Sequence, residues 1–188
     1  MASFPISPHA CRHCQDKLEP NPVTQLDGRA RLLIIGQAPG LKVHQTGIPW
    51  NDPSGQRLRQ WLNMPPETFY DPAHVAILPM GFCYPGRGRH GDNPPDPRCA
   101  PLWHGPILNA LPNIELTLLI GQYAQRHYLA SFSTLTETVQ RWQTWAPSQL
   151  PLPHPSPRNN LWLRRNPWFE RELIPALQRR ILAMGLSA

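Results

Sequence analysis

The sequence has no long hydrophobic run and no segment with the pattern of a secretory signal. Apolar stretches within its 188 residues stay well short of the ~18 residues needed to cross a bilayer. We therefore expect a soluble, cytoplasmic protein that does not contact a membrane. The length suits a single domain covering residues 1–188, and the sequence contains no internal repeats.

Lysine is nearly absent. Lys17 and Lys42 are the only two, so sixteen of the eighteen basic residues are arginine, and the net charge is +6. Arginine binds phosphate through paired hydrogen bonds and stacks on bases, so this composition favours a nucleic-acid partner. Net charge alone is a weak signal, because many basic proteins bind nothing anionic.

Cysteine is also scarce, with four residues in the chain: Cys11, Cys14, Cys83 and Cys99. An even number allows two disulfides, but nothing in the sequence points to secretion. A C-x-x-C pair such as Cys11 and Cys14 in a cytosolic chain more often binds a metal or does redox work. The spacing therefore favours a metal or redox centre over disulfides.

Short apolar runs rich in branched residues alternate with segments of helical periodicity. Strands are expected at residues 31–36, 75–80, 114–120 and 150–152. Helices are expected from residue 53, at 100–111, 122–130 and 135–142, and after Asn166–Pro167. This alternation predicts a three-layer α/β/α sandwich around a central, mostly parallel four-stranded sheet. Residues 1–30 are expected to form an extended arm, and residues 40–53 and 81–98 to form loops.

The first strand runs into Gly36-Gln37-Ala38-Pro39-Gly40. In an open α/β sheet, the loop at the carboxyl end of the first strand is a common ligand site. Glycine allows close approach of the backbone to a ligand, and Pro39 stiffens the loop. The spacing fits neither a dinucleotide-binding nor a Walker loop. An ordinary strand-to-loop exit is an equally good interpretation of this segment alone.

A second loop, residues 153–160, follows the last expected strand. Prolines at 153, 155 and 157 fix its backbone around His154 and Ser156. The carboxyl ends of parallel strands lie on one edge of a sheet, so this loop and the first-strand loop can share a pocket.

Three motifs in this order resemble the uracil-DNA glycosylase superfamily over most of the chain. Gly36–Gly40 is similar to the first motif of its family 4. Thr46-Gly47-Ile48-Pro49-Trp50 resembles the segment whose aromatic ring stacks on a flipped base. His154-Pro155-Ser156-Pro157-Arg158-Asn159 is similar to the second motif of the single-strand-selective monofunctional branch. The resemblance implies a monomeric DNA glycosylase that removes a deaminated base, such as uracil, from DNA in base excision repair.

The resemblance also implies roles for individual residues. Catalytic roles fall to Asp52, His154 and Gln37, base binding to Gly36, Ala38 and Trp50, and DNA binding to Ser54, Ser156 and Arg158. His154 would donate a hydrogen bond to the departing base, and Arg158 would be the wedge that enters the vacated base stack. These roles have plainer alternatives. For Trp50 the alternative is a place in the core, which is as common for a tryptophan at a loop-to-helix junction.

The sequence departs from the family pattern at two places. Gln37 and Ala38 stand where related proteins carry an acid or an amide that positions the attacking water, and neither can act as a base. Asp52, within Asp52-Pro53-Ser54-Gly55, resembles the water-activating aspartate of family 5, although it can also be only a helix N-cap. Pro79 occupies the place of the asparagine that reads the base edge, which leaves uracil specificity open.

Fifteen residues separate Cys83 from Cys99, after the upstream C-x-x-C pair. With that pair, this spacing resembles the iron–sulfur ligand set of family 4. It implies a 4Fe-4S cluster, with zinc as the alternative, that anchors the N-terminal arm to the 81–99 segment. Four unrelated buried thiols are the plainer alternative.

A rival function belongs to another class. The neutral residues Gln37 and Ala38 favour a DNA- or nucleotide-binding protein that has lost catalysis on the same scaffold. Asp52 and the intact His154-Pro155-Ser156-Pro157 loop favour the enzyme.

Overall fold

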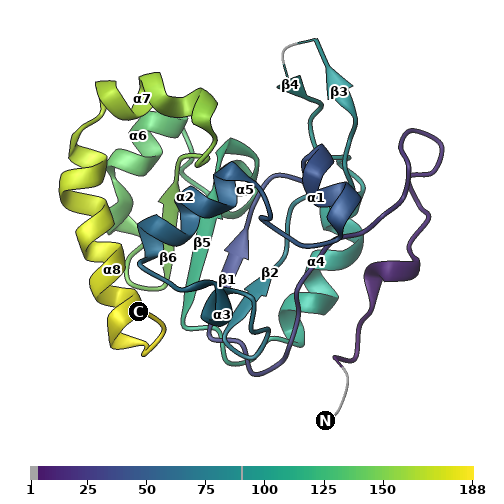
Figure 1. Ribbon diagram of the computed structural model, residues 1–188, viewed down its shortest axis with the longest axis horizontal. Coiled ribbons are helices and arrows are strands. Elements are labelled where there is room, and N and C mark those ends of the chain that lie inside the picture. Colours follow the sequence, from purple (N-terminus) through teal and green to yellow (C-terminus); the bar gives the residue numbers. More distant parts are fainter. Residues whose placement is uncertain (1–3, 90) are drawn as a thin grey trace.

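The computed structural model describes residues 4–89 and 91–188, and its centre is a parallel four-stranded sheet (Figure 1). The strands are β1 (Leu32–Ile35), β2 (Val75–Ile77), β5 (Leu116–Ile120) and β6 (Gln149–Leu152), in the spatial order β2-β1-β5-β6. All three strand pairs are parallel. The sheet predicted from the apolar runs is therefore confirmed.

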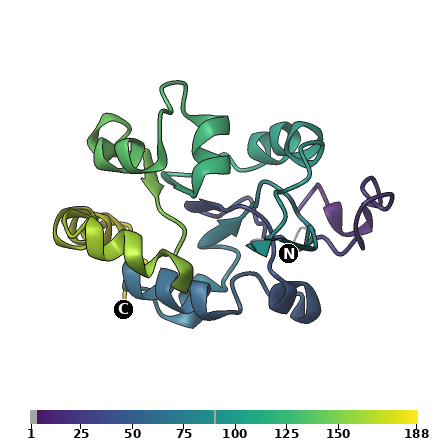
Figure 2. The same cartoon turned by 90° about the horizontal axis from the view of Figure 1, so that it is seen from above.

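Helices cover both faces of the sheet (Figure 2). One face carries α2 (Pro53–Leu62) and α8 (Ile174–Ala183), and the other carries α4 (Cys99–Asn109) and α5 (Gln122–Tyr128). Alternate residues of β1 contribute to the two sides, with Leu32 and Ile34 in one apolar cluster and Leu33 and Ile35 in the other. A strand buried on both faces explains why its sequence is apolar without alternation.

The loops that follow the four strands meet at one edge of the sheet, the upper edge in Figure 1. β1 leads into Gly36, β2 into Pro79, β5 into Gly121 and β6 into His154. This edge is where an open parallel sheet usually binds its ligand.

Several short elements complete the fold. They are α1 (Leu41–Thr46), α3 (Pro66–Phe69), α6 (Leu135–Gln140), α7 (Asn160–Arg165), the 3-10 turns Pro8–Ala10, Trp142–Thr144 and Pro157–Asn159, and a π-helical turn at Phe169–Leu173 that leads into α8. A two-stranded hairpin, β3 (Arg87–Gly88) with β4 (Gly91–Asp92), projects above the sheet edge (Figure 1).

Two of these elements correct the prediction of plain loops. The 40–53 segment contains α1, and the 81–98 segment contains the β3–β4 hairpin. α1 is only six residues long and ends at Gly47, which takes the left-handed conformation with φ 69°. Both elements are shorter than the windows over which periodicity can be recognised.

The N-terminal arm runs along the outer edge of β2. Its Val23 N–H donates to the Phe82 carbonyl at 2.8 Å, and Gln25 forms an antiparallel bridge with Ile77. The Gln25 side-chain amide also donates to the Val75 carbonyl at 2.7 Å. Residues 23–25 of the arm therefore cover the backbone of the edge strand, which protects that edge from other chains.

None of the helices in the described part of the chain has the length and apolar character to cross a bilayer.

Candidate functional site

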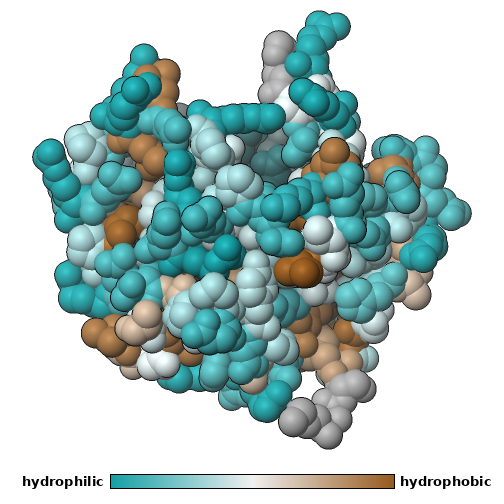
Figure 3. Space-filling view, in the orientation of Figure 1, coloured by the Kyte–Doolittle hydropathy of each residue, from teal (hydrophilic) through white to brown (hydrophobic). Residues whose placement is uncertain are grey.

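A cavity of about 580 Å³ opens at the carboxyl edge of the sheet. Figure 3 shows this side of the molecule hollowed at the foot of the projecting hairpin. Nine residues singled out from the sequence line this one cavity: Gly36, Gln37, Ala38, Trp50, Asp52, Ser54, His154, Ser156 and Arg158. Its volume lies in the range of pockets that hold small organic ligands.

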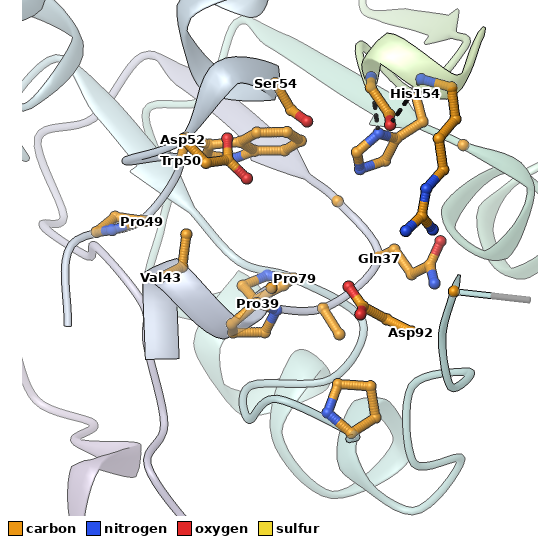
Figure 4. A pocket seen from close by; sticks show the side chains of 18 of the residues that line it. Gln37, Pro39, Val43, Pro49, Trp50, Asp52, Ser54, Pro79, Asp92 and His154 are labelled. Atoms are coloured by element: carbon orange, nitrogen blue, oxygen red, sulfur yellow. Dashed lines mark hydrogen bonds between the residues drawn. The ribbon is translucent and has the colours of Figure 1, made fainter. Parts of the chain in front are cut away.

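The wall after β1 is fixed by backbone hydrogen bonds to the chain that follows β2. The Met80 N–H donates to the Gly36 carbonyl at 2.9 Å, and the Gly81 N–H donates to the Gln37 carbonyl at 3.0 Å. These bonds hold the Gly36–Gln37 backbone in place, so that the Gln37 side chain reaches the cavity (Figure 4).

The six-membered ring of the Trp50 indole lies against Gly36, which follows β1. A Cβ on Gly36 would lie 2.9 Å from its Cζ2 atom, so only glycine leaves room for the ring there. Trp50 itself adopts a left-handed backbone with φ 56°, which is unusual for a bulky residue. Its carbonyl accepts hydrogen bonds from Arg59 Nη1 and the Tyr70 hydroxyl, each at 3.4 Å. These contacts hold the strained turn, and the ring centroid lies 5.6 Å from that of His154.

Asp52 begins α2, as predicted. Its Oδ1 accepts a hydrogen bond from the Gly55 N–H at 2.8 Å, and the same residue also lines the cavity. Gly55 is required by the same turn, because a Cβ there would overlap the Trp50 carbonyl oxygen. The N-cap interpretation of Asp52 is confirmed. Its carboxylate also lies beside the Trp50 ring, at the wall of the cavity (Figure 4).

His154 faces the cavity from the loop after β6. Its Nδ1 accepts a hydrogen bond from the Ser156 N–H at 3.1 Å, so a neutral ring carries its proton on Nε2. Burial lowers the pKa of His154, while the charges of Asp52 and then Asp92 act to raise it. A neutral imidazole with Nε2–H available is therefore a hydrogen-bond donor that brings no charge of its own.

The rest of the 153–160 loop is held by its own side chains. Asn159 Nδ2 donates to the His154 carbonyl at 2.7 Å, and Ser156 Oγ accepts from the Arg158 N–H at 3.2 Å. The Arg158 side chain lies against the hairpin, where a Cβ on Gly91 would overlap its guanidinium nitrogen. Ser54, on α2, is 8% exposed and lines the same cavity.

Three residues of the site or its support were missed from the sequence. Asp92 reaches the cavity from the β3–β4 hairpin. Buried His104 donates from Nε2 to the carbonyl of Pro79, a lining residue, at 3.0 Å. Gln125, fully buried, donates from Nε2 to the Leu152 carbonyl at 2.8 Å, at the end of β6. Lone polar residues within a loop or helix carry no periodic signal, and α5 contains other polar residues beside Gln125.

The four cysteines come from the N-terminal arm and from the 83–99 segment. Burial, with smaller contributions from the charges of Cys83, Cys14 and Cys11, raises the pKa of Cys99 to about 12. Burial likewise raises the pKa of Cys83, with smaller contributions from Cys11 and Cys14. These mutual effects mean that the four thiols gather in one region, and a bound cation would relieve them. Their chemistry fits a thiolate-bound metal.

Their arrangement is not that of a formed metal site. Across residues 4–89 and 91–188, no three His, Cys, Asp or Glu side chains are grouped to hold a metal ion. The Sγ of Cys99 instead accepts a hydrogen bond from the Phe82 N–H at 3.4 Å.

The cavity unites an aromatic ring, a neutral imidazole donor and carboxylates at the edge of a parallel α/β sheet. Comparison with known families gives an independent result. The family model of the uracil DNA glycosylase superfamily matches residues 23–178, which include the whole sheet and every residue of the cavity discussed above. The chain therefore belongs to the uracil-DNA glycosylase superfamily.

Proposed function

We propose that this protein is a DNA glycosylase that hydrolyses the bond between a deaminated base and its deoxyribose. The observation that carries the proposal is the His154 ring. Its Nδ1 is engaged by the Ser156 N–H at 3.1 Å, which leaves Nε2–H as the donor in a cavity that also contains Trp50 and Asp52.

The base would enter the cavity after it leaves the DNA stack, which costs a few kcal/mol. Trp50 offers an aromatic surface for stacking, and Gly36 and Ala38 leave their backbone close to the base. Pro79 lines the cavity where related enzymes read the base with an amide. Because proline has no side-chain donor or acceptor, the cavity offers less discrimination among deaminated bases. Uracil, hypoxanthine and xanthine are all candidate substrates.

The chemistry needs a donor for the departing base and an oriented water. As the glycosidic bond breaks, negative charge develops on the base, and Nε2–H of His154 stabilises its oxygen. One such donor is worth roughly 2.7–4 kcal/mol in comparable oxyanion sites. Asp52 accepts the proton of the attacking water through the carboxylate oxygen that does not cap α2. The Gln37 amide hydrogen-bonds and orients the same water.

DNA would be bound across the mouth of the cavity. Ser54, Ser156 and Arg158 line the cavity. The two serines can donate to phosphate oxygens, and Arg158 would enter the space left by the flipped base. The net charge of +6, mostly from arginine, supplies general attraction to the backbone. The Arg57 guanidinium, which donates to the Ser156 carbonyl at 3.3 Å, stabilises the loop that makes these contacts.

The decisive experiment is a panel of oligonucleotides that carry uracil, hypoxanthine or xanthine, assayed under single-turnover conditions for alkali-labile sites. His154→Ala and Asp52→Asn should each lower the excision rate by roughly 10²–10⁴-fold. Asparagine caps helices about as well as aspartate, so Asp52→Asn should leave stability almost unchanged. If Asp52→Asn excises at the wild-type rate, Asp52 is only a helix cap.

Arg158 calls for a separate measurement. Arg158→Ala should reduce capture of the flipped base more than binding to undamaged DNA, because a wedge acts after the protein has landed. Equal losses in both would make Arg158 one more phosphate contact. Arg164→Ala, on α7, is the matched control for loss of one positive charge.

We also propose that Cys11, Cys14, Cys83 and Cys99 hold a 4Fe-4S cluster, with zinc as the alternative metal. The mutual influence of the thiols on their pKa values supports this assignment. The group would supply no step of the hydrolysis and would fasten the arm to the 83–99 segment. Metal analysis and visible absorption of anaerobically purified protein test it, with Cys11→Ser as the variant. Full-length protein without iron or zinc would contradict it.

A second candidate function is DNA or nucleotide binding without catalysis. It is favoured by the neutral side chains of Gln37 and Ala38 in the loop after β1. Wild-type protein that binds the panel oligonucleotides and releases no base would establish it.

A further inference from the structure

The β3–β4 hairpin brings a second carboxylate to the cavity. Asp92, the last residue of β4, lines the same cavity as Asp52. Its Oδ2 lies 3.8 Å from the position that a Cβ on Gly40 would occupy, and its Oδ1 accepts a hydrogen bond from the Tyr84 hydroxyl at 3.5 Å. Asp92 is therefore placed against the loop after β1, the loop in which Gln37 and Ala38 carry no charge.

The two carboxylates approach from different walls. In Figure 4, Asp52 lies beside the Trp50 ring, whereas Asp92 lies on the side of Gln37. Both charges act to raise the pKa of His154, so both are near the imidazole that faces the cavity. Asp52 and Asp92 are the acidic residues among those that line this cavity in the described chain.

A carboxylate at this position conflicts with plain DNA binding. Asp92 is exposed and lines the cavity from a hairpin that projects above the sheet edge, where phosphate groups would approach. Like charges repel there, so Asp92 weakens general attraction to DNA unless it meets a positive group. Arg158 is near, since its guanidinium lies against Gly91, yet no ion pair between Arg158 and Asp92 is formed within the described residues.

Hydrolysis of a glycosidic bond creates such a positive group. The sugar acquires cationic character in the transition state, and enzymes that break these bonds commonly place two carboxylates on opposite sides of it. A base stacked on Trp50 in this cavity would keep its sugar joined to the DNA backbone, and therefore at the mouth of the cavity, which Gly91 and Asp92 of the hairpin help to line. The carboxylate at the mouth is that of Asp92.

We propose that Asp92 is a second catalytic carboxylate, which stabilises the positive charge that develops on the sugar of the flipped nucleotide. This inference rests on the proposed glycosylase function. The water oxygen bonds to C1′ while the C1′–N bond breaks and its electron pair goes to the base. The water proton passes to Asp52, and Asp92 takes no proton in this step. The two acids therefore differ in role: one accepts a proton and the other acts through charge alone.

The first test is kinetic. Asp92→Asn should lower the single-turnover excision rate by about 10²-fold, as expected for loss of one preorganised charge. It should bind undamaged DNA as tightly as the wild type, or tighter, because a negative charge is removed. Glu67→Gln, an exposed acid on α3, is the control for removal of one negative charge.

The second test does not need catalysis. Two duplexes are compared, one with a cationic pyrrolidine in place of the sugar and the other with a neutral tetrahydrofuran. Wild-type protein should prefer the cationic duplex, and Asp92→Asn should lose about tenfold or more of that preference, or 1.4 kcal/mol per factor of ten. Tyr84→Phe, which removes only the hydroxyl that holds Asp92, should lose a smaller part of it.

The outcomes separate the two proposals. An Asp92→Asn variant with unchanged rate and unchanged preference for the cationic sugar overturns the role of Asp92 and leaves the glycosylase function standing. Parallel losses of rate and of binding to undamaged DNA also overturn it, since Asp92 would then only support the hairpin. Wild-type protein that releases no base overturns the glycosylase function, and with it the catalytic role of Asp92.

Discussion

Acidification should destabilise this protein through one buried histidine, His104. Its side chain is 3% exposed, Nε2 donates to the Pro79 carbonyl at 3.0 Å, and Nδ1 is 2.5 Å from the Tyr128 hydroxyl. Its ring stacks on Phe82 with centroids 5.9 Å apart. Burial lowers the pKa of His104 to about 4, and the charge of His127 contributes in the same direction. The folded protein therefore holds this imidazole neutral.

The magnitude follows from the difference between the folded and unfolded states. The ordinary pKa of histidine is 6.5 and the folded pKa is about 4. Between these values the unfolded chain binds more protons, so the free energy of unfolding rises with pH. The full contribution, about 3 kcal/mol at 1.36 kcal/mol per pKa unit, is present above pH 6.5. It is lost progressively as the pH falls toward 4.

Urea denaturation at a series of pH values from 7.5 to 4.5 measures this effect. His104→Gln cannot titrate and keeps a side-chain amide to donate to Pro79. At pH 7.5 the free energy of unfolding of His104→Gln should be lower than that of the wild type. Between pH 7.5 and 4.5 the wild type should lose about 2.5 kcal/mol more of its free energy of unfolding than His104→Gln does. The pKa of His154 is also lowered, but both proteins contain it, so its contribution cancels in the comparison.

A second variant tests the cause. Tyr128→Phe removes the hydroxyl near Nδ1 but leaves His104 buried, so most of the pH dependence should remain if burial dominates. If the wild type and His104→Gln lose stability in parallel between pH 7.5 and 4.5, the reasoning is refuted. The titrating group would then lie elsewhere in the chain.

Two further substitutions test how the cavity is supported. Gly55→Ala places a methyl group on the Trp50 carbonyl oxygen and should cost about 1–3 kcal/mol, as overpacking does, with a change in tryptophan fluorescence. Gly105→Ala, within α4, whose Cβ would meet no atom within 4 Å, should not lower stability. Gln125→Leu removes the amide that donates to carbonyls at the ends of β5 and β6. It should cost about 1–3 kcal/mol in urea denaturation and slow excision through displacement of His154. Unchanged stability would contradict the bridging role of Gln125.

The sheet could be predicted from the sequence because its signal is local. Each strand is a short apolar run, and β1 and β5 each end at a glycine, a pattern that requires no knowledge of the neighbouring strands. The start of α2 could also be predicted from the sequence. Asp52 followed by Pro53 combines an N-cap with a proline at the first helical position, and the structure has both.

The hairpin could not be predicted, because its strands are two residues each and exist only through pairing with one another. Nothing in Arg87–Asp92 distinguishes it from an ordinary loop rich in glycine. The left-handed conformation of Trp50 could not be predicted from the sequence either. It depends on Gly36 and Gly55 leaving space and on Arg59 and Tyr70 holding the carbonyl, all of which are distant contacts.

The motif residues were found because their loops follow strands of one parallel sheet. Gly36 follows β1 and His154 follows β6, and parallel strands place both loops on one edge whatever their separation in sequence. Asp92 follows no strand of the main sheet. Its place in the cavity depends on how a long connection folds back over the edge, which no rule of sheet topology specifies.

This difference affects how the neutral loop after β1 should be interpreted. Gln37 and Ala38, taken alone, favour a protein that has lost catalysis. A carboxylate acts on a reacting atom through its distance and charge, not through the segment that carries it. The structure has two carboxylates, Asp52 and Asp92, against the cavity that this loop helps to form. Absence of an acid from one motif is therefore insufficient to infer loss of activity; the complete lining of the cavity has to be examined.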